Sequence, residues 1–556
     1  MKTTRLAAIL PLSLLTISLA QGAQYRVVEL GTTDIGQSAF ASDINDSGQV
    51  SVNIQNLYRP PIDVSLINFE LESLIDSLTD IEAAKAGNLN DKDYLLLYSY
   101  VMNNRENQYF QQIAQANSYI GDEFSLSLSS GFDFFDSATG KYATATNTTL
   151  RGLNDMGYAV GVGQGQFYKL PYTFEDESER TFVLNDFYSR AFAQINDHIV
   201  ALPPPDTTAG GLSDAFDINA NNQVVGYGTT EILSENFLTN VENCNDDTER
   251  GDLPVESCMR TLSQSLNSNV GSIAQRRGLI WQLDDQGNLI STKQLGILYQ
   301  LAEDETRALT GTAVAINDNG IAVGESPVKY QDTSFLTTAA AIYIDDQIAT
   351  INSDSEVISS SATDINNDDI VVGYITKRVN GYTRRKFFVH DLNTDKTMYP
   401  NDFFQGSSSV ATSINNNGMV VGYAEAEASL GNRRNQGFIY DIQADTFTSL
   451  QTMLACDSEY SIQQAQGIND NNEIIATAVR KGKSKNALGE VRLDEDGVEV
   501  EADLVVSVKL VPIVGGTADQ CDVENPDIRE RQGAGMGWLM LLSLFGFVCR
   551  KVLRKH

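Results

Sequence analysis

The segment SATDINNDDIVVGYITK (Ser361–Lys377) is nearly repeated by SVATSINNNGMVVGYAE (Ser409–Glu425), and the asparagines Asn366 and Asn415 are 49 residues apart. Both copies place small residues before Ile-Asn, then polar residues or Gly, then Val-Val-Gly-Tyr. Asn and Gly tolerate the left-handed backbone of tight turns, and a β-branched pair suits a buried strand. Each copy therefore predicts a strand, a tight turn and a second strand.

The same motif recurs along most of the chain. Its later copies are spaced by 49, 49 and 54 residues, and the earlier spacings range from 23 to 98. A period of 40 to 50 residues is typical of solenoids, propellers or arrays, and the irregular spacings indicate insertions. The asparagines of the motif are Asn45, Asn90, Asn154, Asn196, Asn219, Asn317, Asn366, Asn415 and Asn469.

A second strand pair follows each motif, as in the aromatic-rich stretches Arg384–Pro400 and Asn435–Leu450. Four strands per copy make one propeller blade, so the sequence predicts an all-β β-propeller of four-stranded blades, seven or alternatively eight in number. Asn196 and Asn219 are too close for both to mark a blade. The strand Gln24–Gly31 should complete the last blade, because this removes an exposed sheet edge.

The propeller is expected to span residues 24–514, with insertions near 98–140 and 229–274. Phe69–Gly87 is the best candidate for a helix, lying between blades or before one. Residues 515–532 form an acidic linker. Loops on a rigid scaffold usually carry binding function, so we expect function in the insertions.

The two ends of the chain carry sorting signals. Residues 1–23 combine a charged start, a short apolar run and small residues, which predicts a signal peptide cleaved after Ala20 or Ala23. In residues 533–556, a patch beginning Gly533-Ala534-Gly535 precedes a short apolar helix and a basic cluster. This order resembles the GlyGly-CTERM tails of bacterial surface proteins, which implies a cleaved sorting signal. A plain C-terminal membrane anchor is the alternative.

The repeat itself resembles the HAF repeat of predicted extracellular bacterial proteins, in which an INxxGxVVGY segment alternates with an aromatic strand and a DLG-like element. That element is present here as Glu29-Leu30-Gly31 and Gln294-Leu295-Gly296. With the tail, the chain is similar to an uncharacterised bacterial envelope family, a domain of unknown function. The resemblance implies an exported protein in the periplasm, on the membrane or at the cell surface.

Charge and cysteines agree with export. The 556-residue chain has a net charge of −34, which disfavours nucleic acid as a partner. Of its five cysteines, Cys549 lies in the tail. The other four predict disulfides in an oxidising compartment, Cys244–Cys258 across a short polar loop and Cys456–Cys521.

Catalytic patterns are scarce. The chain has three His, of which His198 and His390 lie in the repeat region, and no common hydrolase, metalloprotease or nucleotide-binding motif. Two loops resemble part of a calcium loop but lack its twelfth-position Glu, so capped turns are the preferred interpretation. Tyr227, Tyr374 and Tyr423 are expected to pack between blades. The calcium candidates are Asp43, Asn45, Asp364, Asn366 and Asp368.

These patterns predict a noncatalytic binding, adhesion or scaffold module of the cell envelope. Its ligand would be a protein or a carbohydrate, and its tail would contact the inner membrane at least transiently. No cofactor other than calcium is suggested. The alternative is an envelope hydrolase that uses carboxylates in the propeller channel.

Overall fold

The computed structural model describes residues 24–137, 140–196, 198–301, 306–331, 333–351, 356–427 and 433–519. The expected signal peptide, with Ala20, and the tail with Gly533, Ala534 and Gly535 lie outside these residues. No helix within them is long and apolar enough to cross a bilayer.

Within the described residues, the strands form five four-stranded antiparallel sheets, one eight-stranded sheet and two small two-stranded ones. The eight-stranded sheet consists of two four-stranded antiparallel units joined by the single parallel pair Ser38–Val505. This gives seven four-stranded units, here called blades 1 to 7 in chain order. Blades 1 to 3 are β2 (Gly36–Ile44), β3 (Val50–Leu57), β4 (Ala116–Gly121), β5 (Leu126–Ser129); β8 (Thr148–Leu153), β9 (Ala159–Gly163), β12 (Arg190–Ile195), β13 (His198–Leu202); and β14 (Ser213–Ile218), β15 (Gln223–Ile232), β16 (Ala274–Leu283), β17 (Leu289–Gln294). Blades 4 to 6 are β18 (Thr312–Ile316), β19 (Ala322–Lys329), β20 (Leu336–Ile344), β21 (Gln347–Thr350); β22 (Val357–Ile365), β23 (Ile370–Val379), β24 (Tyr382–Asp391), β25 (Lys396–Met398); and β26 (Ser409–Ile414), β27 (Met419–Glu425), β28 (Asn435–Asp441), β29 (Thr446–Ser449).

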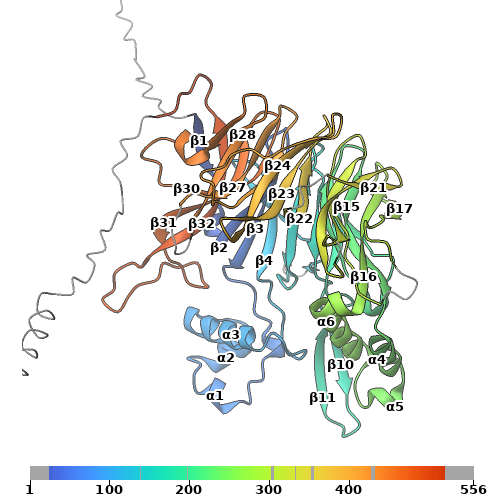
Figure 1. The fold of residues 1–556 in the computed structure, drawn as a ribbon. Helices are drawn as coiled ribbons and strands as arrows, with labels where there is room; N and C mark the ends of the chain where they lie inside the picture. The colour runs from blue at the N-terminus through green and yellow to red at the C-terminus, as the bar shows by residue number, and fades with distance from the viewer. Residues whose placement is uncertain are drawn as a thin grey trace, which may run out of the picture.

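Blade 7 joins the two ends of the described chain. It consists of β30 (Ser461–Ile468), β31 (Ile474–Lys483), β32 (Glu501–Pro512) and the N-terminal β1 (Tyr25–Glu29). β1 pairs antiparallel with β32, with Val27 opposite Leu510, so the predicted completion of the last blade is confirmed. In Figure 1 the dark blue β1 lies beside the orange-red strands. The mostly-β, propeller-like arrangement expected from the repeat is thus present.

The repeat residues form the blades for local reasons. Val371 and Val372 of β23 are fully buried, as a strand between two packed layers requires. A Cβ on Gly373 would lie 2.1 Å from the carbonyl oxygen of Ser361, so only glycine fits against β22. Every innermost strand has a register shift between the residues four and two before its asparagine, such as Ala362 and Asp364. Such a bulge bends the strand, here at the same place in each blade.

Three insertions interrupt blades 1 to 3, each between the second and third strands. Because the asparagine turns join the first and second strands, the insertions leave from the opposite end, at the bottom of Figure 1. They contain α1 (Glu72–Ile75), α2 (Ile81–Lys85) and α3 (Asp91–Asn103) in blade 1; β10 (Tyr168–Thr173) and β11 (Glu179–Leu184) in blade 2; and α4 (Glu235–Asn245), α5 (Asp247–Arg250) and α6 (Val255–Ile273) in blade 3. A small hairpin of β6 (Phe135–Asp136) and β7 (Lys141–Tyr142) follows blade 1, and short 3-10 turns lie at η1 (Thr32–Asp34), η2 (Val64–Leu66), η3 (Thr208–Gly210) and η4 (Leu450–Met453).

Several predicted boundaries differ from the structure. Asn90 marks no blade corner; its side chain accepts from the Asp93 backbone N–H and caps α3. The same amide chemistry caps turns and helices, so the motif alone did not separate them. Asn196 lies in the outer β12–β13 turn with φ 54°, which leaves Asn219 as the corner. The region near 98–140 includes the blade strands β4 and β5. The insertion at 229–274 is mainly helical, and the short α5 lies in the stretch between Cys244 and Cys258 that was expected to be a polar loop.

Candidate functional site

Seven asparagines form a closed ring of hydrogen bonds at one end of the propeller. In each, the side-chain oxygen accepts from the backbone N–H four residues later, and the side-chain nitrogen donates to the asparagine carbonyl of the next blade. The inter-blade distances are 2.9–3.2 Å, and the last bond, from Asn469 to Asn45, returns to blade 1. These buried side chains therefore hold the fold together, as their interpretation as capped turns predicted. The members are Asn45, Asn154, Asn219, Asn317, Asn366, Asn415 and Asn469.

A second ring is formed by the residue that follows each ring asparagine, and it lies at the mouth of the central channel on the asparagine-ring end of the propeller. In six blades its side-chain oxygen accepts the backbone N–H of the preceding blade's equivalent residue, at 2.7–2.9 Å. Ala220 has no side-chain oxygen to offer the Asp155 N–H. The mouth holds a cavity of about 190 Å³ lined by all seven blades. The second ring consists of Asp46, Asp155, Ala220, Asp318, Asn367, Asn416 and Asp470.

Three aspartates converge inside the channel, from alternate blades. Both oxygens of each carboxylate accept backbone N–H bonds, one from its own blade and one from the next; in Asp364 these come from Ile365 and Ile414, each at 2.8 Å. Burial raises the pKa of Asp217 to about 6, and burial together with the charge of Asp217 raises the pKa of Asp364 to about 7. Burial and the other two carboxylates raise the pKa of Asp43 well above its ordinary value. These acids link blades, and each of their carboxylate oxygens already accepts one backbone N–H bond.

The calcium candidates are all placed in this framework. Asp43 and Asp364 are two of the channel acids, and Asn45 and Asn366 belong to the asparagine ring. The backbone N–H of Asp368 donates to the Asn366 side chain, within the same turn. Across the described ranges, no group of three His, Cys, Asp or Glu is placed to hold a metal ion.

The two internal histidines have ordinary strand positions. His390 is buried in β24, its Nδ1 lies 2.9 Å from Thr397 Oγ1, and burial lowers its pKa. His198 is exposed at the start of β13. Two of the motif tyrosines lie beneath guanidinium groups: Arg276 is 5.3 Å from the centre of the Tyr227 ring, and Arg385 is 4.8 Å from that of Tyr374.

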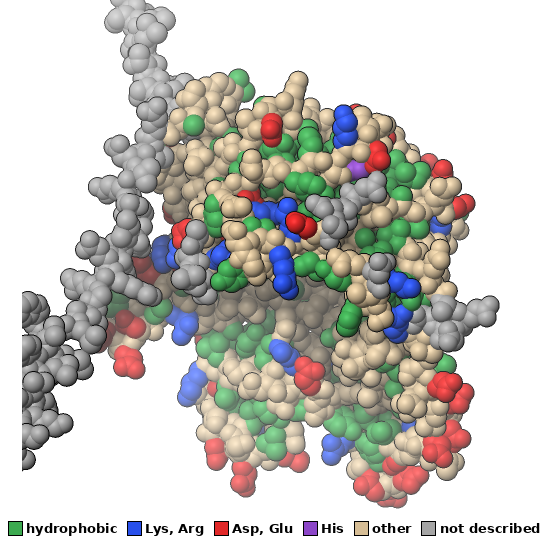
Figure 2. Space-filling model, viewed as in Figure 1, with side chains coloured by type: hydrophobic (Ala, Val, Ile, Leu, Met, Phe, Trp, Pro, Cys, Tyr) green, Lys and Arg blue, Asp and Glu red, His purple; other side chains and the backbone are tan. Residues whose placement is uncertain are grey.

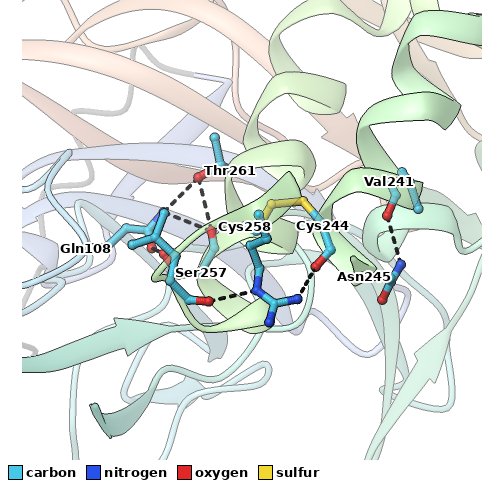
Figure 3. Close-up of a disulfide and its surroundings, with 9 residues drawn as sticks. Gln108, Val241, Cys244, Asn245, Ser257, Cys258 and Thr261 are labelled. Atoms are coloured by element: carbon cyan, nitrogen blue, oxygen red, sulfur yellow. Dashed lines mark hydrogen bonds between the residues drawn. A yellow bond between two sulfur atoms is a disulfide. The ribbon is translucent and has the colours of Figure 1, made fainter. Parts of the chain in front are cut away.

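At the opposite end, the three insertions pack into one body, here called the insertion lobe (residues 58–115, 164–189 and 233–273). Gln108 of the first insertion donates to Thr261 Oγ1 at 3.0 Å and accepts from Ser257 Oγ at 2.6 Å, both on α6 (Figure 3). The Gln108 carbonyl also accepts the Val183 N–H of β11. All three insertions thus meet near one residue.

A disulfide joins α4 to α6 within the lobe. Cys244 and Cys258 are bonded, with their Cα atoms 5.6 Å apart, which confirms this predicted pair (Figure 3). Cys456 is also disulfide-bonded. Cys521 lies outside the described residues, so the Cys456–Cys521 pair stays a prediction.

A large cleft lies between the first insertion, the β6–β7 hairpin and the β10–β11 hairpin. Its volume is about 750 Å³, within the range of small-molecule sites. Lys169 of β10 reaches across it to Asp63, at 2.5 Å. Figure 2 shows the surface hollowed between the blades and the two parts of the lobe. The apolar and aromatic lining comes chiefly from Ile62, Leu66, Phe134, Tyr142, Phe167 and Tyr168.

A family profile matches almost the whole chain, residues 4–551, under the description "Protein of unknown function (DUF3466)". The chain belongs to the DUF3466 family. No curated protein matches it.

Solved structures that resemble this DUF3466 chain share little sequence with it. The Pyrococcus horikoshii acylaminoacyl peptidase is 9% identical over 82% of this chain and 51% of its own, with a TM-score of 0.37. A puromycin-hydrolyzing peptidase of Mycobacterium tuberculosis is 10% identical over 91% of this chain and 57% of its own, with a TM-score of 0.38. An oligogalacturonate lyase of Vibrio parahaemolyticus is 10% identical over 66% of this chain and 98% of its own, with a TM-score of 0.30. The DUF3466 chain spans little more than half of either peptidase, and these values transfer no activity to it.

Sequence reasoning missed two features of the DUF3466 chain. Asp217 lies two residues before its ring asparagine, as Asp43 and Asp364 do. Comparing this position across the aligned repeats would have identified the three channel aspartates. The cleft left no such signal, because its walls come from separate insertions.

Proposed function

We propose that this chain is an exported, noncatalytic β-propeller of the cell envelope that binds a ligand in the cleft of its insertion lobe. The cleft is the observation that carries the proposal. A concave, mostly apolar space with a few polar groups is the usual form of a binding site. The asparagine ring is closed by its own hydrogen bonds and serves as scaffold.

The envelope location rests on the sequence of the two ends. Residues 1–23 have the pattern of a signal peptide, and residues 533–556 that of a sorting tail or anchor. The Cys244–Cys258 disulfide is in keeping with an oxidising compartment. We propose the periplasm, the membrane or the cell surface as the site of action, with a protein or carbohydrate as the source of the bound group. Mass spectrometry of the mature protein would define both ends.

One alternative function has an observation of its own. The raised pKa values of Asp217 and Asp364 would suit a general acid in an envelope hydrolase. However, each carboxylate accepts two backbone N–H bonds, which favours a structural role. The hydrolase predicts that Asp217→Asn abolishes a hydrolytic activity that the cleft variants retain.

Binding of an uncharged apolar dye, N-phenyl-1-naphthylamine, tests the proposed function. We expect saturable binding of one dye molecule per full-length chain. Ala145 lines the cleft, so the larger side chain of Ala145→Trp should fill the space and abolish dye binding. Ala444→Trp, at an exposed turn of blade 6, is the matched control and should bind normally. Wild-type protein that binds neither this dye nor the anionic 8-anilino-1-naphthalenesulfonate, or equal binding by Ala145→Trp, would overturn the proposal.

A further inference from the structure

Arg260 of α6 is a buried cation at the edge of the cleft. Its residue surface is 4% exposed, its Nη1 donates to the Val183 carbonyl, and its guanidinium lies 5.2 Å from the centre of the Phe167 ring. Its Nε is buried and, within the described part of the chain, has no hydrogen-bond partner. Within those same ranges no carboxylate lies at ion-pair distance from Arg260.

Arg260 lines a smaller cavity of about 220 Å³ that adjoins the cleft. Gln112, Ala145 and Phe167 line both spaces, so the polar cavity, here called the chamber, borders the apolar cleft at these side chains. The other charged residues of the chamber, Arg105 and Glu106, lie 3.5 Å from each other. The chamber therefore has one net positive charge, and Arg260 supplies it.

A buried guanidinium without an anion is costly, since burial of charge is favourable only with a partner. Burial lowers the pKa of Arg260 to about 10, although Glu106 and two tyrosines act in the other direction. The chain contains 73 acidic residues against 39 basic ones, so acidic partners are abundant in its composition. Yet none pairs with this arginine among the described residues. This arrangement is the one expected where the counter-charge arrives with a ligand.

We propose that the cleft binds a small organic anion, with an apolar body in the large cavity and a carboxylate-like group against Arg260. This inference rests on the proposed function, since it specifies the chemistry of the ligand in the same cleft. Phe167 would contact both parts, because it walls the cleft and stacks on the guanidinium. Charged hydrogen bonds to Arg260 would then distinguish an anion from a neutral molecule of equal shape.

A pair of dyes with one aromatic skeleton tests the proposal. 8-Anilino-1-naphthalenesulfonate carries one negative charge, and N-phenyl-1-naphthylamine carries none. For the full-length wild type we expect the anionic dye to bind at least tenfold more tightly. Arg260→Gln should remove that preference while leaving the neutral dye's dissociation constant within about twofold. Arg180→Gln, an exposed arginine of β11 outside both cavities, is the matched control and should keep the preference.

The outcomes separate the two proposals. If wild type binds both dyes equally, or Arg260→Gln keeps the preference, the anion site is wrong while the cleft stands. If wild type binds neither dye, the proposed function itself is wrong. Neutral-dye binding by Arg260→Gln also reports that the lobe is folded, and Arg260→Lys, which keeps the charge, should restore part of the preference. Tight binding only of a macromolecule, with no dye competition, would likewise contradict a small-molecule site.

Discussion

The two ends of this propeller use polar residues in opposite ways. At the asparagine ring, seven nearly identical turns satisfy one another, and each side chain supports both its own turn and the next blade. At the insertion lobe, unrelated segments meet around a large apolar cleft, and the buried guanidinium of Arg260 has no anionic partner among the described residues. The comparison teaches that repetition builds the closed scaffold, whereas departures from the repeat build the surface that is free to bind.

The blades also divide into a group that keeps the repeat and a group that departs from it. Blades 4 to 7 keep close to the period of the repeat, with ring asparagines 49, 49 and 54 residues apart. Blades 1 to 3 contain the three insertions, and their ring asparagines are 65 to 109 residues apart. A long insertion between the second and third strands costs little loop entropy, since those strands stay paired. Elaboration is therefore tolerated where it leaves the ring untouched.

The largest expected effect follows from breaking the ring. Asn366→Ala removes the bond to the Asn415 carbonyl and leaves the N–H groups of Asp368 and Ile370 without their acceptor. We expect the free energy of unfolding to fall by about 4 kcal/mol. Urea unfolding followed by circular dichroism measures this. Asn393→Ala, at an exposed turn of the same blade, should cost less than about 1 kcal/mol, and equal losses would contradict the special role of the ring.

The lobe should respond separately from the ring. Replacing both Cys244 and Cys258 by Ser opens a link across 14 residues of sequence, worth about 3 kcal/mol by loop entropy. We expect faster amide hydrogen exchange in α6 and unchanged exchange in β23 of blade 5. Parallel acceleration in both elements would show that the two ends unfold as one unit.

A third effect concerns the channel acids. The pKa of Asp364 is about 7 in the folded chain, against an ordinary value of 3.8 for this carboxyl, so the folded state binds the extra proton between these two pH values. The stability that this carboxyl contributes is complete below about pH 4 and is lost as pH rises to about 7. Asp364→Asn cannot titrate, so its unfolding free energy should fall by about 3 kcal/mol less than that of wild type between pH 4.5 and 7.5.

Urea titrations at the two pH values give this difference directly. Asp368→Asn, at an exposed position of the same turn, is the control and should follow wild type. If the difference in unfolding free energy between Asp364→Asn and wild type stays the same from pH 4.5 to 7.5, Asp364 is ionised in the folded chain over that whole range.

The smallest effect comes from completing the second ring. Ala220→Asn supplies the missing side-chain oxygen for the Asp155 N–H without adding charge. We expect a gain of about 0.5–1 kcal/mol, typical of one added hydrogen bond at an exposed site. Ala444→Asn, at an exposed turn of blade 6 outside the ring, should change stability less. A loss of stability in Ala220→Asn would show that the gap in the ring is not simply an absent acceptor.

Sequence alone determined the repeated unit, its strand–turn–strand form and the completion of blade 7 by Gln24–Gly31, because these depend on neighbouring residues and on an edge that must be covered. It also predicted the Cys244–Cys258 pair from the short distance along the chain. It misassigned Asn90, whose amide caps a helix instead of a turn with the same local chemistry.

Only the tertiary structure decided which asparagines join the ring and what the insertions make together. The ring bonds connect residues 49 to 109 positions apart, or 424 where Asn469 meets Asn45. The cleft and Arg260 likewise depend on segments that become neighbours once blades 1 to 3 stand side by side. No local pattern encodes such contacts, because their partners are selected by the packing of the whole propeller.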